Sequence, residues 1–500
     1  MPILAIQIWA LFVVAPWLAR MALARYATRR WARLGRVALL ALALVGTFVL
    51  AVGLRPFVAA FAPTYTLATV LLIGVPIAVA TAVRRVPLAE RLVSGGLGVV
   101  ASLGGGLLLW MTIFNIQYGY GSDCEPTLAE PRNRVLFGPC KAGFEDQVRT
   151  IVGAQAELLD ARQSRAVWPA ADPRYVYTAC GLEGTEAKDH PLLRIDRRTG
   201  AIDRSYVTSA VFDGSCDANS RRCIVLLSAE QRFLVIDDVT GEIVHEAALP
   251  VGPRFVAMHG HQAMVGLAAP PVMIRVDLLT GAVVFPSAEE SLYLGIASRG
   301  GGFAAVGVDP TADDTFFTIE YPASSLGEIL SFPSGPLAIA LLGYSPLGHG
   351  TLARLGLDPG QVTIGQLTPR DAFWSFGLML GIAPDRSRNT VYFISPTAGE
   401  MVAHDYDSLA FQWRLGLKSG ARLGDIDRAR GRLFAGDYAG GWLFVVDVDQ
   451  RKVVDKLYAG RGIRQVRFDP SHGRVLVASR AGFVEIDVYG DASKAPIPTP

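Results

Sequence analysis

The sequence has almost no excess charge of either sign, and this absence narrows the classes of function. Among its 500 residues, 47 Lys and Arg stand against 45 Asp and Glu, for a formal net charge of +2. Its second half has no Lys- and Arg-rich stretch interleaved with aromatic residues, the usual signature of a nucleic-acid-binding surface. We therefore expect no nucleic acid among its partners.

Cysteine is also scarce, and it is confined to one part of the chain. The five cysteines are Cys124, Cys140, Cys180, Cys216 and Cys223. They form no Cys-x-x-Cys pair, so their spacing does not fit a zinc site. Their placement after residue 120 favours an oxidising compartment. Cys216 and Cys223 bracket a short polar turn and are predicted to form a disulfide, and Cys124 with Cys140 is the second candidate pair, although the sequence alone does not fix connectivity.

Charged residues are absent from three long apolar stretches near the N-terminus, 37–54, 64–83 and 92–114, and a fourth apolar stretch covers 3–18. The three have about the length that a bilayer core requires, roughly 20 residues. Soluble helices rarely stay apolar on every face for so long. We expect a four-helix transmembrane domain over residues 1–116, with membrane lipid as a partner.

Arginines between these stretches predict the orientation. Arg55 alone separates the second from the third, whereas the first and third connections are rich in arginine (Arg20, Arg25, Arg29, Arg30, Arg33 and Arg36; Arg84, Arg85 and Arg91). Basic loops stay in the cytoplasm. The N-terminus and everything after the fourth stretch are therefore predicted to lie on the periplasmic side of a bacterial inner membrane.

Two further segments have their own composition. Residues 117–149 are rich in Gly, Pro and charge. Within 117–164 we expect a juxtamembrane loop and then an amphipathic helix, because Phe144, Val148 and Ile151 recur at helical spacing. The last segment, 491–500, contains three prolines and is predicted to be a disordered tail.

A motif recurs about every forty residues through the second half of the chain. A short apolar run, an acid and then Thr-Gly appear around Asp196, Asp237 and Asp277. Weaker copies centre on Glu320, Asp358, Asp405, Asp447 and Asp487. A fixed period of this length, filled with short strands and turns, is typical of a β-propeller. We place the propeller at 165–490.

One repeat illustrates the expected blade. Residues 253–258, 262–267, 272–277 and 282–285 are four short strands separated by polar turns, the composition of one propeller blade. The acid before each Thr-Gly is expected to close the turn through its side-chain oxygen, and the glycine to supply a positive φ. We therefore interpret the clearest turn acids as structural residues: Asp196, Asp237, Asp277, Asp447 and Asp487.

The number of acids predicts the number of blades. Eight acids give eight blades, and seven blades with an insertion is the alternative, because the copy around Asp358 is degenerate. The last copy ends after its third strand, at Asp487. A closed ring needs a fourth strand there, and the segment before Tyr175 is free to supply it.

Three segments resemble the YVTN and NHL-like propeller repeats, in which a polar, Pro-containing turn leads into a Val-Tyr-Val strand. They are 171–178, with Pro173 before Tyr175-Val176-Tyr177-Thr178, and 383–394 and 463–478. The resemblance implies the propeller fold. Membrane anchoring before a propeller is also similar to the layout of membrane-bound quinoprotein dehydrogenases.

Blades of that dehydrogenase family carry Asp-x-x-x-Gly-x-x-x-Trp docking motifs. The Asp and Gly are matched at Asp196/Gly200, Asp237/Gly241 and Asp277/Gly281, but the Trp positions hold Arg204, His245 and Phe285. Trp413 follows Asp405 at the right distance, but Leu409 replaces the glycine. We expect no cofactor.

No other constellation predicts catalysis. His259 and His261 lie on a hairpin turn without a third ligand nearby, and Asp309, Asp313 and Asp314 do not follow a calcium-loop spacing. We expect no metal site. The favoured function is a membrane-anchored binding or scaffold module for a protein partner of the envelope. The alternative is a periplasmic quinone-dependent dehydrogenase or another enzyme with its site in the propeller channel.

Overall fold

A computed structural model describes residues 123–144, 146 and 164–490, with gaps at 181–189, 209–210, 268–271, 287–302, 310–314, 321–350, 357–361, 367–380, 396–398, 418–420 and 439. These residues form seven four-stranded antiparallel sheets, which we number as blades 1 to 7 along the chain. The predicted membrane stretches of 1–116, the predicted amphipathic helix apart from Phe144 and Asp146, and the tail 491–500 lie outside the described residues.

The first three blades are complete in sequence order. Blade 1 contains β2 (Ser164–Pro169), β3 (Tyr175–Cys180), β4 (His190–Asp196) and β5 (Ile202–Thr208). Blade 2 contains β6 (Val211–Asp217), β7 (Arg222–Leu227), β8 (Arg232–Asp237) and β9 (Ile243–Ala248). Blade 3 contains β10 (Pro253–His259), β11 (Gln262–Leu267), β12 (Val272–Asp277) and β13 (Val283–Val284).

The remaining blades follow the same order, except the last. Blade 4 contains β14 (Phe303–Val308), β15 (Thr315–Glu320), β16 (Thr351–Gly356) and β17 (Val362–Gln366). Blade 5 contains β18 (Ile382–Asp385), β19 (Thr390–Ser395), β20 (Glu400–Asp405) and β21 (Phe411–Gly416). Blade 6 contains β22 (Ala421–Asp427), β23 (Arg432–Asp437), β24 (Trp442–Asp447) and β25 (Lys452–Tyr458). Blade 7 contains β26 (Gln465–Asp469), β27 (Arg474–Ser479), β28 (Gly482–Ile486) and β1 (Asn133–Phe137).

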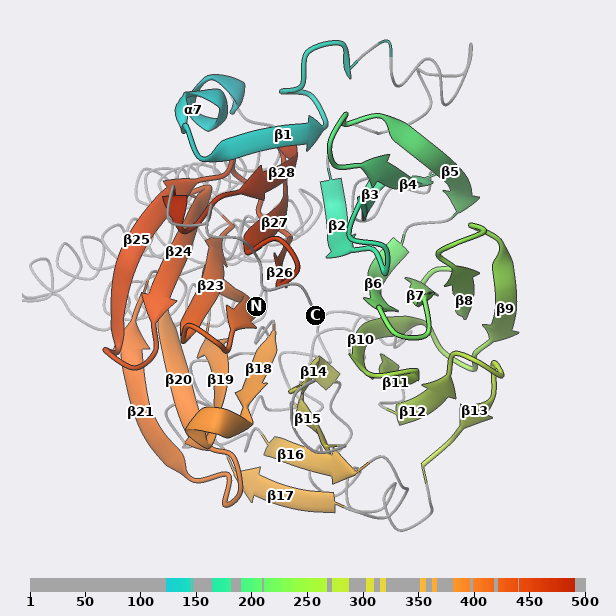
Figure 1. The fold of residues 1–500 in the computed structure, drawn as a ribbon. Coiled ribbons are helices and arrows are strands. Elements are labelled where there is room, and N and C mark those ends of the chain that lie inside the picture. Colours follow the sequence, from blue (N-terminus) through green and yellow to red (C-terminus); the bar gives the residue numbers. More distant parts are fainter. Residues whose placement is uncertain are drawn as a thin grey trace, which may run out of the picture. The chain divides into compact units, whose positions relative to one another are not determined.

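The blades are arranged as a ring (Figure 1). The first strand of each blade lies innermost and contacts the first strand of the next, and β26 of blade 7 contacts β2 of blade 1. Central strands are buried on both faces because each blade packs against two neighbours; β7 and β24, for example, are buried over almost their whole length. The outer strands β9 and β25 are largely exposed. The apolar runs of the repeats are therefore the central strands of each blade, which the neighbouring blades cover on both faces.

The predicted architecture, a four-helix transmembrane bundle followed by eight blades, is wrong for the described residues. The helix α7 (Cys124–Ala129) has six residues and is about 9 Å long, far shorter than a bilayer core. Across the described ranges, none of the helices is long and apolar enough to cross a membrane. The described residues form an all-β propeller with seven four-stranded sheets.

The eighth predicted blade arose from one misleading acid. In the other blades the repeated acid ends or follows the third strand, but Glu320 ends β15, the second strand of blade 4. Thirty residues separate it from β16, which pairs with β15 from Thr315↔Gly356 to Glu320↔Thr351. Glu320 and the acid that follows β16 in sequence, Asp358, thus belong to a single blade with a long insertion.

The ring is closed by a strand from the start of the described chain. β1 pairs with β28 in an antiparallel register, with Val135 opposite Val484. This confirms that a segment before Tyr175 supplies the missing strand of the last blade. β1 and α7 lie within 117–164, the range that the sequence assigned to a juxtamembrane loop.

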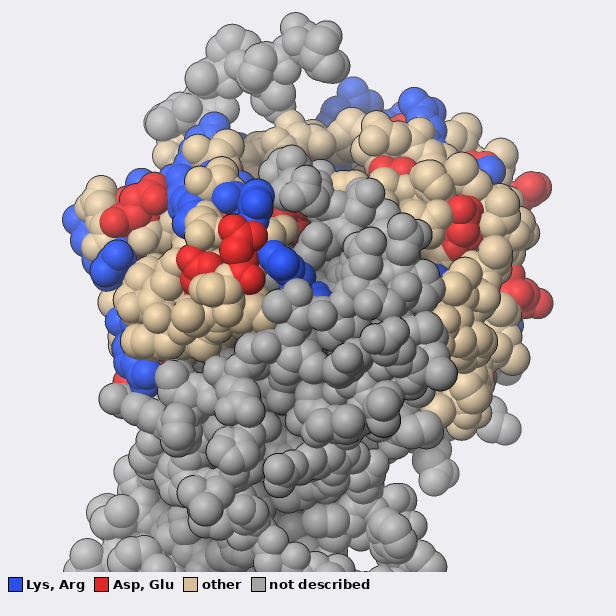
Figure 2. All heavy atoms as spheres, turned by 90° about the horizontal axis from the view of Figure 1, so that it is seen from below, with Lys and Arg blue, Asp and Glu red and all other residues tan. Residues whose placement is uncertain are grey.

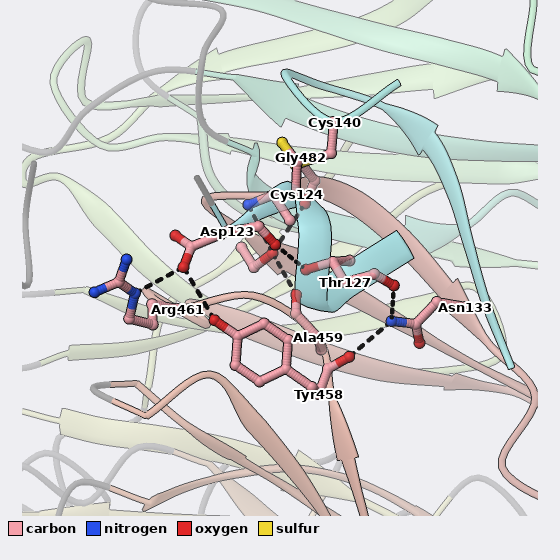
Figure 3. Close-up of a disulfide and its surroundings, with 11 residues drawn as sticks. Asp123, Cys124, Thr127, Asn133, Cys140, Tyr458, Ala459, Arg461 and Gly482 are labelled. Carbon is pink, nitrogen blue, oxygen red and sulfur yellow. Dashed lines mark hydrogen bonds and ion pairs between the residues drawn. A yellow bond between two sulfur atoms is a disulfide. The ribbon is translucent and has the colours of Figure 1, made fainter. Parts of the chain in front are cut away.

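Side chains beside α7 fasten this closure to blade 6 (Figure 3). Cys124 and Cys140 are joined by a disulfide. Asn133 Nδ2 donates to the Tyr458 carbonyl at 2.7 Å, and Thr127 Oγ1 donates to the Asp123 carbonyl at 2.6 Å. β1 is thereby held at both of its ends.

Candidate functional site

The predicted turn acids lie in the turns between third and fourth strands. Asp237 Oδ1 accepts hydrogen bonds from the backbone N–H groups of Val239 at 2.8 Å and Thr240 at 3.0 Å. Asp196 and Asp277 repeat this arrangement, and Gly200, Gly241 and Gly281 have φ of +67°, +72° and +74°. Asp447 accepts from Gln450 N, and Asp487 from Tyr489 N.

The electrostatics of these acids follow from the turn. Burial raises the pKa of Asp237, but the N–H group of Thr240 and the guanidinium of Arg222 outweigh it, so the pKa lies below its usual value. The carboxylate is therefore ionised at neutral pH and is occupied by its own turn.

Two of the positions that hold Trp in quinoprotein blades, Arg204 and His245, contact the turn of the next blade. A side chain at Gly241 of blade 2 would overlap Arg204 of blade 1, and one at Gly281 of blade 3 would overlap His245 of blade 2. His245 Nε2 donates to the Leu279 carbonyl at 3.0 Å. Trp413 of blade 5 faces the Arg451 guanidinium of blade 6 at 5.3 Å. These residues join each outer strand to the turn of the next blade.

The predicted disulfide pair Cys216 and Cys223 is adjacent across a hairpin. Cys216 of β6 lies opposite Cys223 of β7 in the register, and the two are joined by a disulfide. Cys180 ends β3. The sequence signal that relates Cys216 to Cys223 is the polar turn between them.

The candidate metal residues are dispersed or used structurally. His261 Nε2 lies 3.6 Å from Asp277 Oδ2, and His259 ends β10. Asp309 is buried and accepts from the Arg386 N–H of blade 5 at 2.7 Å; Asp313 and Asp314 lie outside the described residues. Within the described ranges, no group of three or more His, Cys, Asp or Glu could hold a metal ion.

A buried ion cluster, which the sequence did not indicate, joins blade 1 to blade 7. Arg197, which follows β4, pairs with Asp469 at the end of β26 and with Glu485 of β28. All three are at least nine-tenths buried. His472 Nδ1 lies 2.9 Å from Asp469 Oδ2. The cluster joins blade 7, which completes the ring, to blade 1.

A second polar cluster links inner strands of blades that are not neighbours. Asp213 of β6 accepts from Gln465 Nε2 at 2.6 Å and Arg467 Nη2 at 2.8 Å, both on β26. Gln465 Oε1 accepts from the Val167 N–H of β2, which lies between them in the ring. Asp213 also accepts from Val256 N of β10. Four inner strands are thus cross-linked, and the polar groups involved are occupied by one another.

The outer rim of blades 2 and 3 carries the most unusual exposed surface. Five apolar side chains there are about half exposed: Val239 (56%), Ile243 (48%), Leu279 (50%), Val284 (46%) and Phe285 (51%). We call them the rim patch. Val239 and Ile243 lie at the β8–β9 turn, and Leu279, Val284 and Phe285 lie at and after the β12–β13 turn; His245 of β9 connects the two blades through the Leu279 carbonyl. In Figure 2, the described surface on the right is mostly uncharged, with acidic side chains along its edge.

At one position of the repeat, blades 2 and 3 differ in polarity from three other blades. Val239 and Leu279 stand two residues after their turn acids. The same position holds Arg198 in blade 1, Asp407 in blade 5 and Asp449 in blade 6. The turn geometry therefore accepts a charged residue here, and an apolar residue is not required by the fold.

Comparison with known proteins gives little beyond the fold. No family model matches the chain, and no curated protein matches it. Among solved structures, hydrazine synthase of Kuenenia stuttgartiensis is 11% identical with a TM-score of 0.48, over 66% of this chain and 97% of that one. The Cps50 (Swd1) β-propeller domain of Myceliophteria thermophila is 10% identical with a TM-score of 0.47, over 65% of this chain and 96% of that one. Both likenesses are too distant to indicate what this chain binds or does.

Proposed function

We propose that the propeller is a protein-binding module that holds an envelope partner against the rim of blades 2 and 3. The observation that carries the proposal is the rim patch. Val239 and Leu279 are apolar at a repeat position that is charged in blades 1, 5 and 6, and both are at least half exposed. Large apolar side chains that stay exposed on neighbouring blades are typical of protein interaction sites.

The energy available at the patch fits a specific contact. Fully burying a large aliphatic or aromatic side chain contributes about 1.5–3 kcal/mol. The five side chains of the rim patch are half buried already, so covering them would contribute roughly 1 kcal/mol each. The hydrogen bond from His245 to the Leu279 carbonyl holds the two blades together at this place, so little ordering is needed on binding.

Affinity capture of the full chain, with cross-linking before extraction, tests this proposal. The double variant Val239→Asp/Leu279→Asp should lose the partner that the parent captures, with a fall in yield of about tenfold or more, because each buried carboxylate would be desolvated without a counter-ion. Both positions are exposed, so the variant should unfold at the same urea concentration as the parent.

A matched control has the same change of charge on another blade. Ala429 and Gln450 are exposed turn residues of blade 6, and Ala429→Asp/Gln450→Asp should capture the partner as well as the parent does. Equal capture by the rim variant and the parent would exclude the rim patch as the docking surface.

We also propose that this binding occurs in the periplasm, on the outer side of a bacterial inner membrane. The disulfides Cys124–Cys140 and Cys216–Cys223 support an oxidising compartment. Alkaline phosphatase, which needs its own disulfides, should be active when fused after Pro500, and a green fluorescent protein that matures only in the cytoplasm should stay dark there. The reverse pair of results would place the propeller in the cytoplasm.

A further inference from the structure

The outer strand of blade 6 gathers cations that have no acidic partner. β25 is the last strand of its sheet and lies at the outer edge of the ring (Figure 1). Lys452 and Lys456 belong to β25, and Arg451 directly precedes it. All three are exposed, and within the described ranges none of their side chains forms an ion pair. We call these three residues the edge cations.

The acids of the same stretch are engaged by other arginines. Three aspartates between residues 447 and 455 each lie 2.6 to 2.8 Å from a guanidinium nitrogen of another segment: Asp447 from Arg432, Asp449 from Arg388 and Asp455 from Arg132. The edge cations are therefore not balanced by the acids beside them in the sequence, and their charge is available to a partner.

Arg451 stands at a backbone position that favours glycine. It follows its turn acid by four residues, where blades 1 to 3 have Gly200, Gly241 and Gly281, and its φ is +53°. A residue with a Cβ is disfavoured in this left-handed region. The Arg451 guanidinium lies 5.3 Å from the ring centre of Trp413, which holds it at the surface. Residues kept in disfavoured conformations cluster at functional sites.

Two exposed valines lie between the edge cations. Val453 and Val454 are 39% and 41% exposed. In the register, Val453 and Lys456 lie opposite residues of β24 that pack against blade 5, so both side chains are on that face of the sheet. The Lys456 ammonium lies 4.3 Å from the ring centre of Trp442. This edge thus presents aliphatic side chains between cations whose positions are fixed by aromatic rings.

We propose that the edge cations and the two valines bind an extended, acidic segment of a partner protein, which lies along β25. Residues 451–456 span about 17 Å, the length of five or six extended residues. Acidic residues of the segment would meet the edge cations, and apolar residues between them would cover the valines.

The same charges disfavour two other occupants. A second copy of this chain would place lysine against lysine, and lysines on an edge strand prevent such pairing. A broad anionic surface such as a membrane would also meet the carboxylate of Asp449, whose side chain is 59% exposed two residues before Arg451. A narrow acidic segment along β25 avoids this carboxylate.

Calorimetry of the full chain with a short peptide of alternating glutamate and valine tests the proposal. The parent should bind the peptide saturably, and more weakly as salt is added, because the ion pairs are exposed. Lys452→Gln/Lys456→Gln should weaken binding by about tenfold, the combined effect of two exposed ion pairs. The matched control Arg198→Gln/Arg221→Gln removes two exposed cations of blades 1 and 2 and should bind the peptide like the parent.

Arg451→Gly separates binding from packing, because it restores the glycine of the other blades. The variant should bind the peptide several-fold more weakly and unfold at the same or a higher urea concentration than the parent. A loss of stability with unchanged peptide affinity would mean that Arg451 serves only the packing of Trp413, and would contradict the proposal.

The remaining outcomes decide between occupants. The proposal is overturned if the parent does not bind the peptide, or if the lysine variant binds it as tightly as the parent. Lysine-dependent sedimentation with phosphatidylglycerol vesicles, without peptide binding, would overturn it in favour of a membrane surface. The rim variant Val239→Asp/Leu279→Asp should bind the peptide like the parent, which separates this site from the partner proposed for blades 2 and 3.

Discussion

Replacing Arg197 by methionine should destabilise the propeller by about 3–5 kcal/mol, the usual cost of removing one partner from a buried ion pair. Asp469 and Glu485 would each keep a buried charge without the guanidinium that now pairs with both. Burial raises the pKa of Asp469, and the hydrogen bond of His472 together with Arg197 holds it below the usual value. His472 alone cannot serve Glu485 as well. The urea midpoint of unfolding should fall, with an unchanged dependence on urea concentration.

Two further variants separate this electrostatic effect from a general effect of substitution. Arg198→Met changes the neighbouring exposed residue of the same turn and should alter stability by less than about 0.5 kcal/mol. Adding Asp469→Asn and Glu485→Gln to Arg197→Met removes all three charges and should recover part of the loss. If Arg197→Met matches the parent, the cluster does not hold blades 1 and 7 together.

The repeat was visible in the sequence because its determinants are local. A turn acid, two N–H groups and a glycine lie within five residues, as at Asp237 and Gly241, and the apolar runs have the length of one strand. Blade 4 shows where local reading fails. The run that ends at Glu320 has the form of a third strand, and only its pairing with β16, beyond a thirty-residue insertion, identifies it as the second.

The contacts between blades could not be predicted because they join residues that are far apart in the chain. Arg197 and Asp469 are 272 residues apart, and nothing in the turn sequence of either residue indicates the other. The rim patch could have been found by aligning the turns, because Val239 and Leu279 differ in polarity from Arg198 at the same repeat position.

The inner strands show how a local sequence signal differs from a contact between distant residues. Asp213 has no distinctive sequence context, yet it accepts hydrogen bonds from β26 and from β10, which lie on the two sides of β6 in the ring. From the sequence alone, a polar residue on an inner strand could be interpreted as a catalytic group. The hydrogen bonds that occupy its oxygens explain why a structural role is the better interpretation.

The disulfide Cys124–Cys140 should matter more than Cys216–Cys223, because it ties down the strand that closes the ring. Replacing Cys124 and Cys140 by serine should destabilise the propeller by about 3 kcal/mol, the loop-closure estimate for a sixteen-residue separation. The seven-residue separation of Cys216 and Cys223 gives about 2 kcal/mol. The β6–β7 ladder already holds that hairpin at four further paired positions on the strand side of the bond.

Limited proteolysis distinguishes the two losses by position. Without Cys124–Cys140, β1 is held to β28 by its ladder and to blade 6 by the hydrogen bond from Asn133 to the Tyr458 carbonyl. It should detach more often than the other strands, and early cleavage should fall between residues 123 and 144. Loss of β1 would leave β28 as an open sheet edge, which invites association with other chains, so concentration-dependent aggregation should accompany the cleavage. The Cys216→Ser/Cys223→Ser variant should show neither effect, and identical cleavage patterns in the two variants would mean that the ring does not depend on this disulfide for its closure.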